Sequence, residues 1–229
     1  MSARILAIET STAACSAALC VEGEVLERHV LAPRQHAVLI LPMIESVLAE
    51  ADIGVRQLDA IAFGRGPGAF TGVRIAASIV QGIAFAAELP VLPVSTLAAL
   101  ALGALRETGA AQAIAALDAR KNEVYWGCYR QDGDGLVLQG SEIVCSPAGT
   151  PQPGPGRWVA AGSGWLAYPE ALLSHCSDAV IRVLPDLEPR AGDVARLGLL
   201  DFLQGGAVTA DAAVPVYLRD NVADAPRPG

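Results

Sequence analysis

The order of apolar and polar positions along the chain predicts alternating strands and helices, which indicates an α/β fold. Three strands come first, with a turn at Glu22–Gly23 between the second and the third. For the first half we predict strands over 4–9, 13–20 and 24–31, a helix over 36–51, a strand over 58–63, a helix over 71–87, a strand over 91–94 and a helix from about Ser95 to Arg106.

A second block of elements begins near Ala111, and its first two strands are predicted to form a hairpin with a turn at 120–122. After these strands, over 113–118 and 123–130, we predict a turn at Gly133–Gly135, a surface loop over 146–156, a strand over 157–161, a helix over 165–174, a strand over 180–184 and a helix over 189–204. Residues 223–229 are expected to be a disordered tail.

Two of the predicted helices carry more apolar residues than one sheet face needs. In the helix over 71–87, the polar residues Arg74, Ser78 and Gln81 form one narrow strip, and nearly all the other residues are apolar or small. Either the helices over 36–51 and 71–87 bury each other, or they form a subunit interface, although the sequence does not show which stripe faces outwards. The candidate interface residues are His36, Leu39, Ile40, Met43, Val47, Phe70, Val73, Arg74, Ala76, Ala77, Ile79 and Val80.

The segment from Gly64 to Ala76 predicts a strand, a tight Gly/Pro loop and a helix, with Thr71 as the helix N-cap. Such a loop can hold an anion, because free N–H groups and the helix dipole point to it. It is neither a Walker A loop nor a G-x-G-x-x-G loop. A capped turn without a ligand is the simpler interpretation.

Composition limits the function classes. The net charge is −8 and the arginines are scattered, so we expect no binding of nucleic acid by this chain alone. The five cysteines include no C-x-x-C pair, which favours reduced thiols in the cytoplasm over disulfides or a zinc site. We expect no signal peptide, because Glu9 interrupts the apolar start, and no membrane span, because polar or proline residues interrupt the apolar windows.

Four segments together resemble the bacterial TsaB (YeaZ) family, in the family's order and nearly from end to end. They are Ile5–Thr12 (ILAIETST), Gly66–Ile75 (GPGAFTGVRI), Leu117–Tyr125 (LDARKNEVY) and Pro215–Arg219 (PVYLR). The resemblance implies a two-lobed actin/hexokinase-like (ASKHA) fold with a reduced second lobe. We expect the first lobe to span 1–108 and the second 109–222.

The resemblance also implies a function: a non-catalytic, cytoplasmic subunit that binds the catalytic protein TsaD. That complex would transfer a threonylcarbamoyl group to N6 of the tRNA adenosine 3′ of the anticodon. The ATPase TsaE would join the assembly, tRNA would bind only through the complex, and a homodimer is the expected alternative when TsaD is absent. No cofactor is expected on this chain alone, whereas ATP or ADP is compatible with the assembled complex.

The alternative function is an active ASKHA-type ATPase or phosphotransferase, with nucleotide at Thr10, Ser11 and Thr12. Here Glu9 stands where the superfamily usually carries an aspartate that orients a metal-bound water. The sequence contains no His-x-x-x-His, His-Glu-x-x-His or Gly-x-Ser-x-Gly motif, which argues against a metal site and against catalysis. We therefore predict no catalytic and no metal-binding residues, and we interpret Asp118, Arg120 and Glu123 as a solvated hairpin tip.

Overall fold

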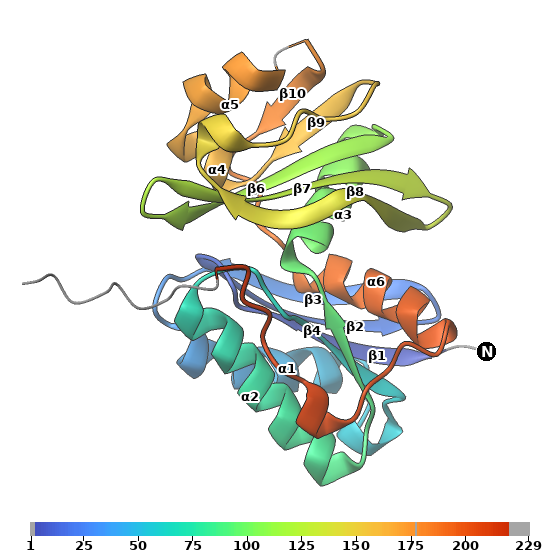
Figure 1. Cartoon of the computed structure of the whole chain (residues 1–229). Helices are drawn as coiled ribbons and strands as arrows, with labels where there is room; N and C mark the ends of the chain where they lie inside the picture. Colours follow the sequence, from blue (N-terminus) through green and yellow to red (C-terminus); the bar gives the residue numbers. More distant parts are fainter. Residues whose placement is uncertain (1–2, 177, 220–229) are drawn as a thin grey trace, which may run out of the picture.

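The computed structural model describes residues 3–176 and 178–219, which form two lobes stacked one above the other (Figure 1). Each lobe is built on a five-stranded sheet. The tail expected at 223–229 lies outside the described residues.

The first sheet has the order β3-β2-β1-β4-β5, in which β1, β2 and β3 are an antiparallel meander and β4 and β5 run parallel to β1. The strands are β1 (Arg4–Glu9), β2 (Ala14–Val21), β3 (Glu24–Leu31), β4 (Ala60–Gly64) and β5 (Val91–Val94). Glu22 and Gly23 both have positive φ, 55° and 86°, which confirms the predicted turn between β2 and β3.

The second sheet repeats this arrangement with the order β8-β7-β6-β9-β10. Its strands are β6 (Gln112–Arg120), β7 (Glu123–Asp132), β8 (Gly135–Cys145), β9 (Trp158–Ala161) and β10 (Val180–Leu184). The repeated topology confirms the two-lobed actin/hexokinase-like fold. The second lobe is the reduced one, because only η2 (Pro147–Gly149) joins β8 to β9, where the first lobe has a full helix between β3 and β4.

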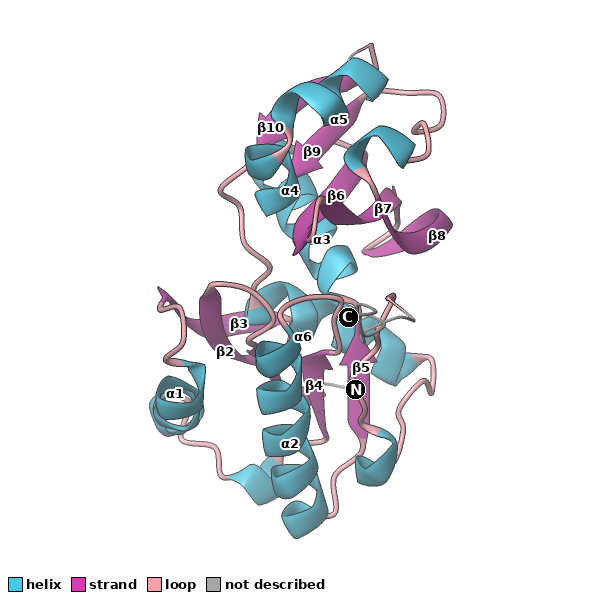
Figure 2. Cartoon of the chain, turned by 60° about the vertical axis from the view of Figure 1, so that its left-hand side comes forward, coloured by secondary structure: helices cyan, strands magenta, loops and turns pink. Residues whose placement is uncertain are grey.

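Helices cover both faces of each sheet (Figures 1 and 2). In the first lobe α1 (His36–Glu50) and α2 (Phe70–Ala87) cover one face, and α6 (Ala191–Leu203) covers the other. In the second lobe α3 (Thr96–Thr108) covers one face, and α4 (Ser163–Ala167) and α5 (Pro169–Cys176) cover the other. Short 3-10 turns, η1 (Val55–Gln57) and η3 (Ala210–Ala212), lie in the connections of the first lobe.

The packing of α3 and α6 corrects the expected domain boundaries of 1–108 and 109–222. Leucines and alanines of α3, expected in the first lobe, are buried against β6 and β9 of the second sheet. Helix α6, expected in the second lobe, packs on the first sheet. Its free N–H groups at Ala191 and Gly192 donate hydrogen bonds of 2.9 Å to the Ser16 hydroxyl and 2.8 Å to the Glu27 carboxylate. Helix α3 therefore belongs to the second lobe and helix α6 to the first, because those sheets bury their apolar faces.

Three local predictions were wrong. Strand β8 was missed, because Gly140 with a φ of 87° and a register shift opposite Trp126–Cys128 interrupt its pattern. The helix predicted over 165–174 is two helices, because Pro169 disfavours a helical conformation at Tyr168. The N-cap of α2 is Ala69 and not Thr71, whose side chain is exposed in the first turn.

Candidate functional site

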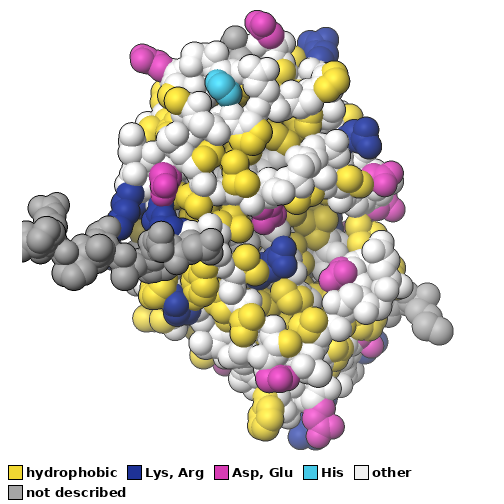
Figure 3. Space-filling view, viewed as in Figure 1, with side chains coloured by type: hydrophobic (Ala, Val, Ile, Leu, Met, Phe, Trp, Pro, Cys, Tyr) yellow, Lys and Arg dark blue, Asp and Glu magenta, His cyan; other side chains and the backbone are white. Residues whose placement is uncertain are grey.

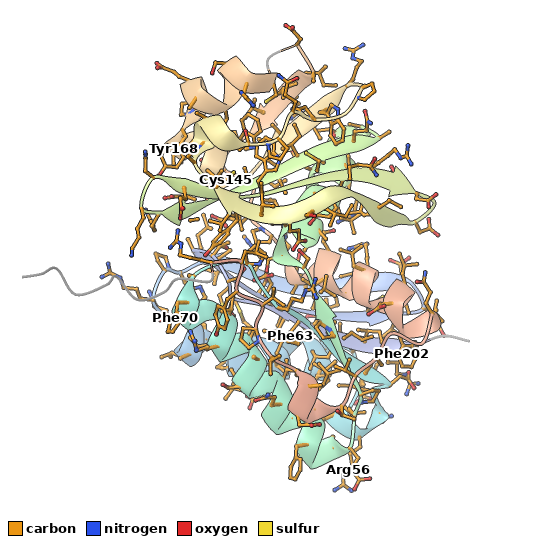
Figure 4. All side chains as sticks on the ribbon, in the orientation of Figure 1. Arg56, Phe63, Phe70, Cys145, Tyr168 and Phe202 are labelled. Atoms are coloured by element: carbon orange, nitrogen blue, oxygen red, sulfur yellow. The ribbon has the colours of Figure 1, made fainter. Side chains whose placement is uncertain are left out.

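The four sequence motifs meet around one cleft of about 970 Å³ between the two lobes. Residues from each motif line it: Ser11, Thr12, Gly68–Val73, Leu117–Lys121, Tyr125, Val216, Tyr217 and Arg219. His36 and Phe70, the first residues of α1 and α2, also line the cleft, so both helices begin there. In Figure 4, Phe70 lies at the upper end of α2, which is the end nearer the second lobe.

Near the cleft Glu9 is fully buried, and its carboxylate is bound by the chain itself. Its Oε1 accepts a hydrogen bond of 2.6 Å from the Ser11 N–H, and its Oε2 accepts one of 3.1 Å from the Thr96 hydroxyl. Burial raises the pKa of this carboxyl above its usual value, against the lowering effect of these hydrogen bonds. The carboxyl therefore joins the end of β1 to the start of α3, and it presents no exposed oxygen to a metal-bound water.

The backbone of Thr10–Ser11 packs directly against the glycine loop. The Ser11 carbonyl accepts a hydrogen bond of 2.7 Å from the Ala69 N–H, and the Thr10 hydroxyl donates one of 2.8 Å to the Gly72 carbonyl. A Cβ on Gly72 would lie 2.0 Å from the Thr10 carbonyl oxygen, so only glycine permits this approach. The Ser11 carbonyl and the Thr10 hydroxyl are thus already bonded to the loop at the start of α2.

Two acidic side chains line the remainder of the cleft. Asp118 forms an ion pair of 2.9 Å with Arg120, and its side chain is only 15% exposed, whereas that of Arg120 is 86% exposed. Of these two residues, only Arg120 is solvated as expected for the hairpin tip. Glu188, which the sequence analysis did not single out, directly precedes the helix predicted over 189–204; it is half-buried, and burial raises the pKa of its carboxyl. Among the residues that the structure describes, no three His, Cys, Asp or Glu side chains converge as they do in a metal site.

A cluster of one cation and two aromatic rings lies at the start of α2. The Arg74 guanidinium lies 3.2 Å from the centroid of the Phe70 ring and 4.9 Å from that of Tyr217. The two rings are 6.1 Å apart, and both are partly exposed. Tyr217 belongs to the fourth motif, but it was not among the predicted site residues.

The structure divides the predicted interface residues into two groups. The buried ones expose little or no surface in the isolated chain: His36, Ile40, Val47, Val73, Ala76, Ala77 and Val80. His36 also shares a hydrogen bond of 3.1 Å with the Ala14 carbonyl. The accessible ones are Leu39, Met43, Phe70, Arg74 and Ile79.

Side chains that the prediction omitted extend the accessible apolar surface. Val38 is 74% exposed on α1 and Phe85 is 83% exposed on α2, and Leu41 is about half exposed. Figure 3 shows hydrophobic side chains over α2 and along the segment beside it. By length and composition alone α2 is apolar enough to cross a membrane, but one side of it packs on the first sheet through Ala76 and Val80.

Several known proteins resemble this chain along nearly its whole length. The model of the family TsaD, tRNA N6-adenosine threonylcarbamoyltransferase, matches residues 30–226. The tRNA threonylcarbamoyladenosine biosynthesis protein TsaB of Escherichia coli (strain K12) is 44% identical over 230 residues, with 99% of each chain covered. The protein of that name from Haemophilus influenzae is 38% identical, with 98% of this chain and 97% of that one covered. The solved structure of YeaZ from Pseudomonas aeruginosa matches with a TM-score of 0.89 and 46% identity, over 94% of this chain and all of the other.

Proposed function

The chain belongs to the TsaB (YeaZ) family and has a role in tRNA threonylcarbamoyladenosine biosynthesis, and from this premise we propose that it is the non-catalytic subunit that binds TsaD. In that role it holds TsaD in an active arrangement while TsaD transfers the threonylcarbamoyl group to N6 of the tRNA adenosine 3′ of the anticodon. The protein then works in the cytoplasm, where tRNA is modified.

The observation that carries the proposal is the apolar surface on the outer sides of α1 and α2. Val38 and Leu41 on α1, and Phe70 and Phe85 on α2, expose large apolar side chains, although these helices already bury another stripe against the sheet. Few charged side chains interrupt the outer surface of these helices: Glu45 and Glu50 on α1, and Arg74 on α2. An apolar centre with few charges is typical of a stable protein interface.

The same surface supports the expected homodimer. A patch that is apolar and nearly free of charge can pair with a second copy of itself when its usual partner is absent. TsaD would then compete with the second copy, because both use α1 and α2.

The contacts of the acidic and hydroxyl groups support a non-catalytic role over the ATPase or phosphotransferase alternative. The Glu9 carboxylate accepts hydrogen bonds from Ser11 and Thr96, and the Thr10 hydroxyl donates one to the Gly72 carbonyl. The net charge of −8 supports tRNA binding through the complex and not through this chain alone. TsaE, and the nucleotide that it needs as an ATPase, then belong to the assembled complex.

The test is reconstitution with the TsaD of the same organism. Mass measurement by light scattering after gel filtration is expected to show a complex of the two chains. In a modification assay with tRNA, TsaD with this chain is expected to be active, whereas this chain without TsaD is expected to be inactive. Transfer by this chain alone, or equal activity of TsaD with and without it, would refute the proposal.

A further inference from the structure

The motif Pro215–Arg219 has no role in the proposed function, yet its path through the molecule is distinctive. After α6 the chain runs beside α2 toward the second lobe (Figure 1), and its residues Val216, Tyr217 and Arg219 line the cleft. It begins on the first lobe and ends in contact with the second. Elsewhere the chain passes between the lobes only at the connection from β5 to α3 and at that from β10 to α6, within the described ranges 3–176 and 178–219.

The first part of this path is fixed to the first lobe. Val208 pairs with Val91 at the edge of the sheet, and Ala213 is fully buried in the core under α1 and α2. The Ala213 carbonyl accepts a hydrogen bond of 3.0 Å from the Gln81 side chain of α2. The Val216 N–H then donates a hydrogen bond of 2.8 Å to the carbonyl of Arg65, in the glycine loop.

Tyr217 fixes the segment at the start of α2. Its ring and that of Phe70 both lie close to the cationic Arg74 side chain, at the distances given above. The cation is attracted by both rings, so this contact positions the two residues that follow Tyr217.

Arg219 crosses to the second lobe and binds the tip of the β6–β7 hairpin. Its guanidinium donates a hydrogen bond of 3.1 Å to the Ala119 carbonyl and one of 3.5 Å to the Arg120 carbonyl, and it forms an ion pair with Glu123. All three contacts are made by one terminal nitrogen of the guanidinium, Nη2, whose two hydrogens are shared among the three acceptors.

The hairpin tip is a conformation that needs such support. Arg120, Lys121 and Asn122 have φ values of 61°, 53° and 62°, so three successive residues other than glycine are left-handed. Each such residue is costly, and the arrangement persists only where neighbouring groups hold it. Asp118 supports the tip from within the hairpin, and Arg219 supports it from the other lobe.

We infer that residues 213–219 are a clasp between the lobes, and that Arg219 sets the width of the cleft by holding the hairpin tip to the first lobe. Without the Arg219 contacts, the described residues still join the lobes at the two chain crossings and through α3, whose Arg106 pairs with Asp193 of α6 and whose Thr96 hydroxyl bonds Glu9. The cleft can then open on the side where the glycine loop faces the hairpin. This inference concerns the isolated chain and does not depend on the proposed binding of TsaD.

The test is a distance measurement between the lobes in solution. Spin labels are attached to Ala49→Cys on α1 and Ser174→Cys on α5, which are exposed positions, in a Cys145→Ser background. The other four cysteines are buried and react slowly with the label. Electron–electron resonance is then recorded with Arg219 intact, in Arg219→Ala, and in the control Arg182→Ala, which removes a different exposed Arg–Glu pair within the second lobe.

Arg219→Ala is expected to shift the distance distribution to longer values or to broaden it, whereas Arg182→Ala leaves it unchanged. Tyr217→Ala is expected to have the same effect as Arg219→Ala, because it removes the contact that positions Arg219. Hydrogen exchange at the amides of 119–123 is expected to become about tenfold faster in Arg219→Ala. If the distribution for folded Arg219→Ala matches that of the parent, or if Arg182→Ala changes it equally, the inference is wrong.

Discussion

The carboxylate of Glu9 occupies the space that a side chain at position 64 would need. A Cβ built on Gly64 would lie 1.9 Å from Glu9 Oε2. The identities of Gly64, the last residue of β4, and Glu9, the last residue of β1, therefore depend on each other. The buried Glu9 carboxyl accepts hydrogen bonds from Ser11 and Thr96, and the absence of a side chain at position 64 leaves room for it.

Gly64→Ala is expected to destabilise the chain by about 1–3 kcal/mol, because the added methyl group overpacks a site with no free volume. Unfolding in urea measures this change. The control is Gly82→Ala on the outer side of α2, where a Cβ meets no atom within 4 Å. Because alanine is the better helix former, this control is expected to stabilise the chain by about 0.5–1 kcal/mol.

A double-mutant cycle tests the cause. In a Glu9→Ala background the space beside position 64 is open, so Gly64→Ala is expected to cost less than it does in the parent. An equal cost in both backgrounds would mean that Glu9 is not what excludes the side chain.

Glu9→Gln is expected to change how stability depends on pH. Burial raises the pKa of Glu9, so the folded chain holds this proton more tightly than the unfolded chain does. The resulting stabilisation is complete below the unfolded pKa and is lost as the pH rises through the raised pKa. Glutamine can still accept from the Ser11 N–H and donate to the Thr96 hydroxyl, but it does not titrate.

The stability advantage of the parent over Glu9→Gln is therefore expected to shrink or reverse as the pH is raised from about 4, near the ordinary value for glutamate, toward neutrality. Urea unfolding of both proteins across this range measures the difference. Parallel pH profiles for the two proteins would contradict the assignment of a raised pKa to Glu9.

Mg-ATP is expected to leave the melting temperature of the isolated chain unchanged. A ligand at a hundred times its dissociation constant stabilises a protein by about 2.7 kcal/mol, which a thermal melt detects easily. Here the Ser11 carbonyl and the Thr10 hydroxyl are already bonded to the glycine loop. A saturable rise in melting temperature with ATP would favour the ATPase alternative.

Ala76→Glu and Ile79→Asp, neighbouring changes on α2, are expected to have different effects. Ala76 is fully buried, so its replacement places a charge in the core and should unfold the first lobe. Ile79 keeps part of its surface exposed, so its replacement should leave the chain folded and weaken partner binding. Circular dichroism and a binding assay on both variants separate the two effects, and a folded Ala76→Glu variant would contradict this assignment of the buried stripe.

Most of the fold could be predicted from the sequence, because strands such as β3 and β5 show their pattern and their turns plainly. The lobe to which a helix belongs could not be predicted. The apolar stripes of α3 and α6 are compatible with either sheet, and the hydrogen bonds of Ser16 and Glu27 to the start of α6 connect residues more than 160 positions apart.

For a similar reason, the sequence indicated some residues of the candidate site but did not separate the buried from the exposed residues of α1 and α2. All four motifs contribute residues to the lining of the cleft, among them Ser11 and Asp118, although Asp118 was interpreted from the sequence as part of a solvated hairpin tip. On α1 and α2, nearly every position is apolar, so periodicity could not distinguish the buried Val80 from the exposed Phe85. Only the packing of the helix on the sheet makes that distinction.

The central claim is that the exposed apolar surface of α1 and α2 binds TsaD, and charge substitution tests it most directly. Val38→Glu and Phe85→Glu each place a charge on this surface without touching the core. The matched controls are Leu166→Glu on α4 and Leu203→Glu on α6, at leucines that are 62% and 60% exposed elsewhere on the molecule.

The measurement is the dissociation constant of each folded variant for TsaD, by titration calorimetry. The account predicts that Val38→Glu and Phe85→Glu weaken binding at least about tenfold, because a desolvated charge without a partner costs more than 1.4 kcal/mol. It predicts that Leu166→Glu and Leu203→Glu bind as the parent does. Parent-like binding by both α1 and α2 variants would contradict the account, and so would an equal loss in the controls.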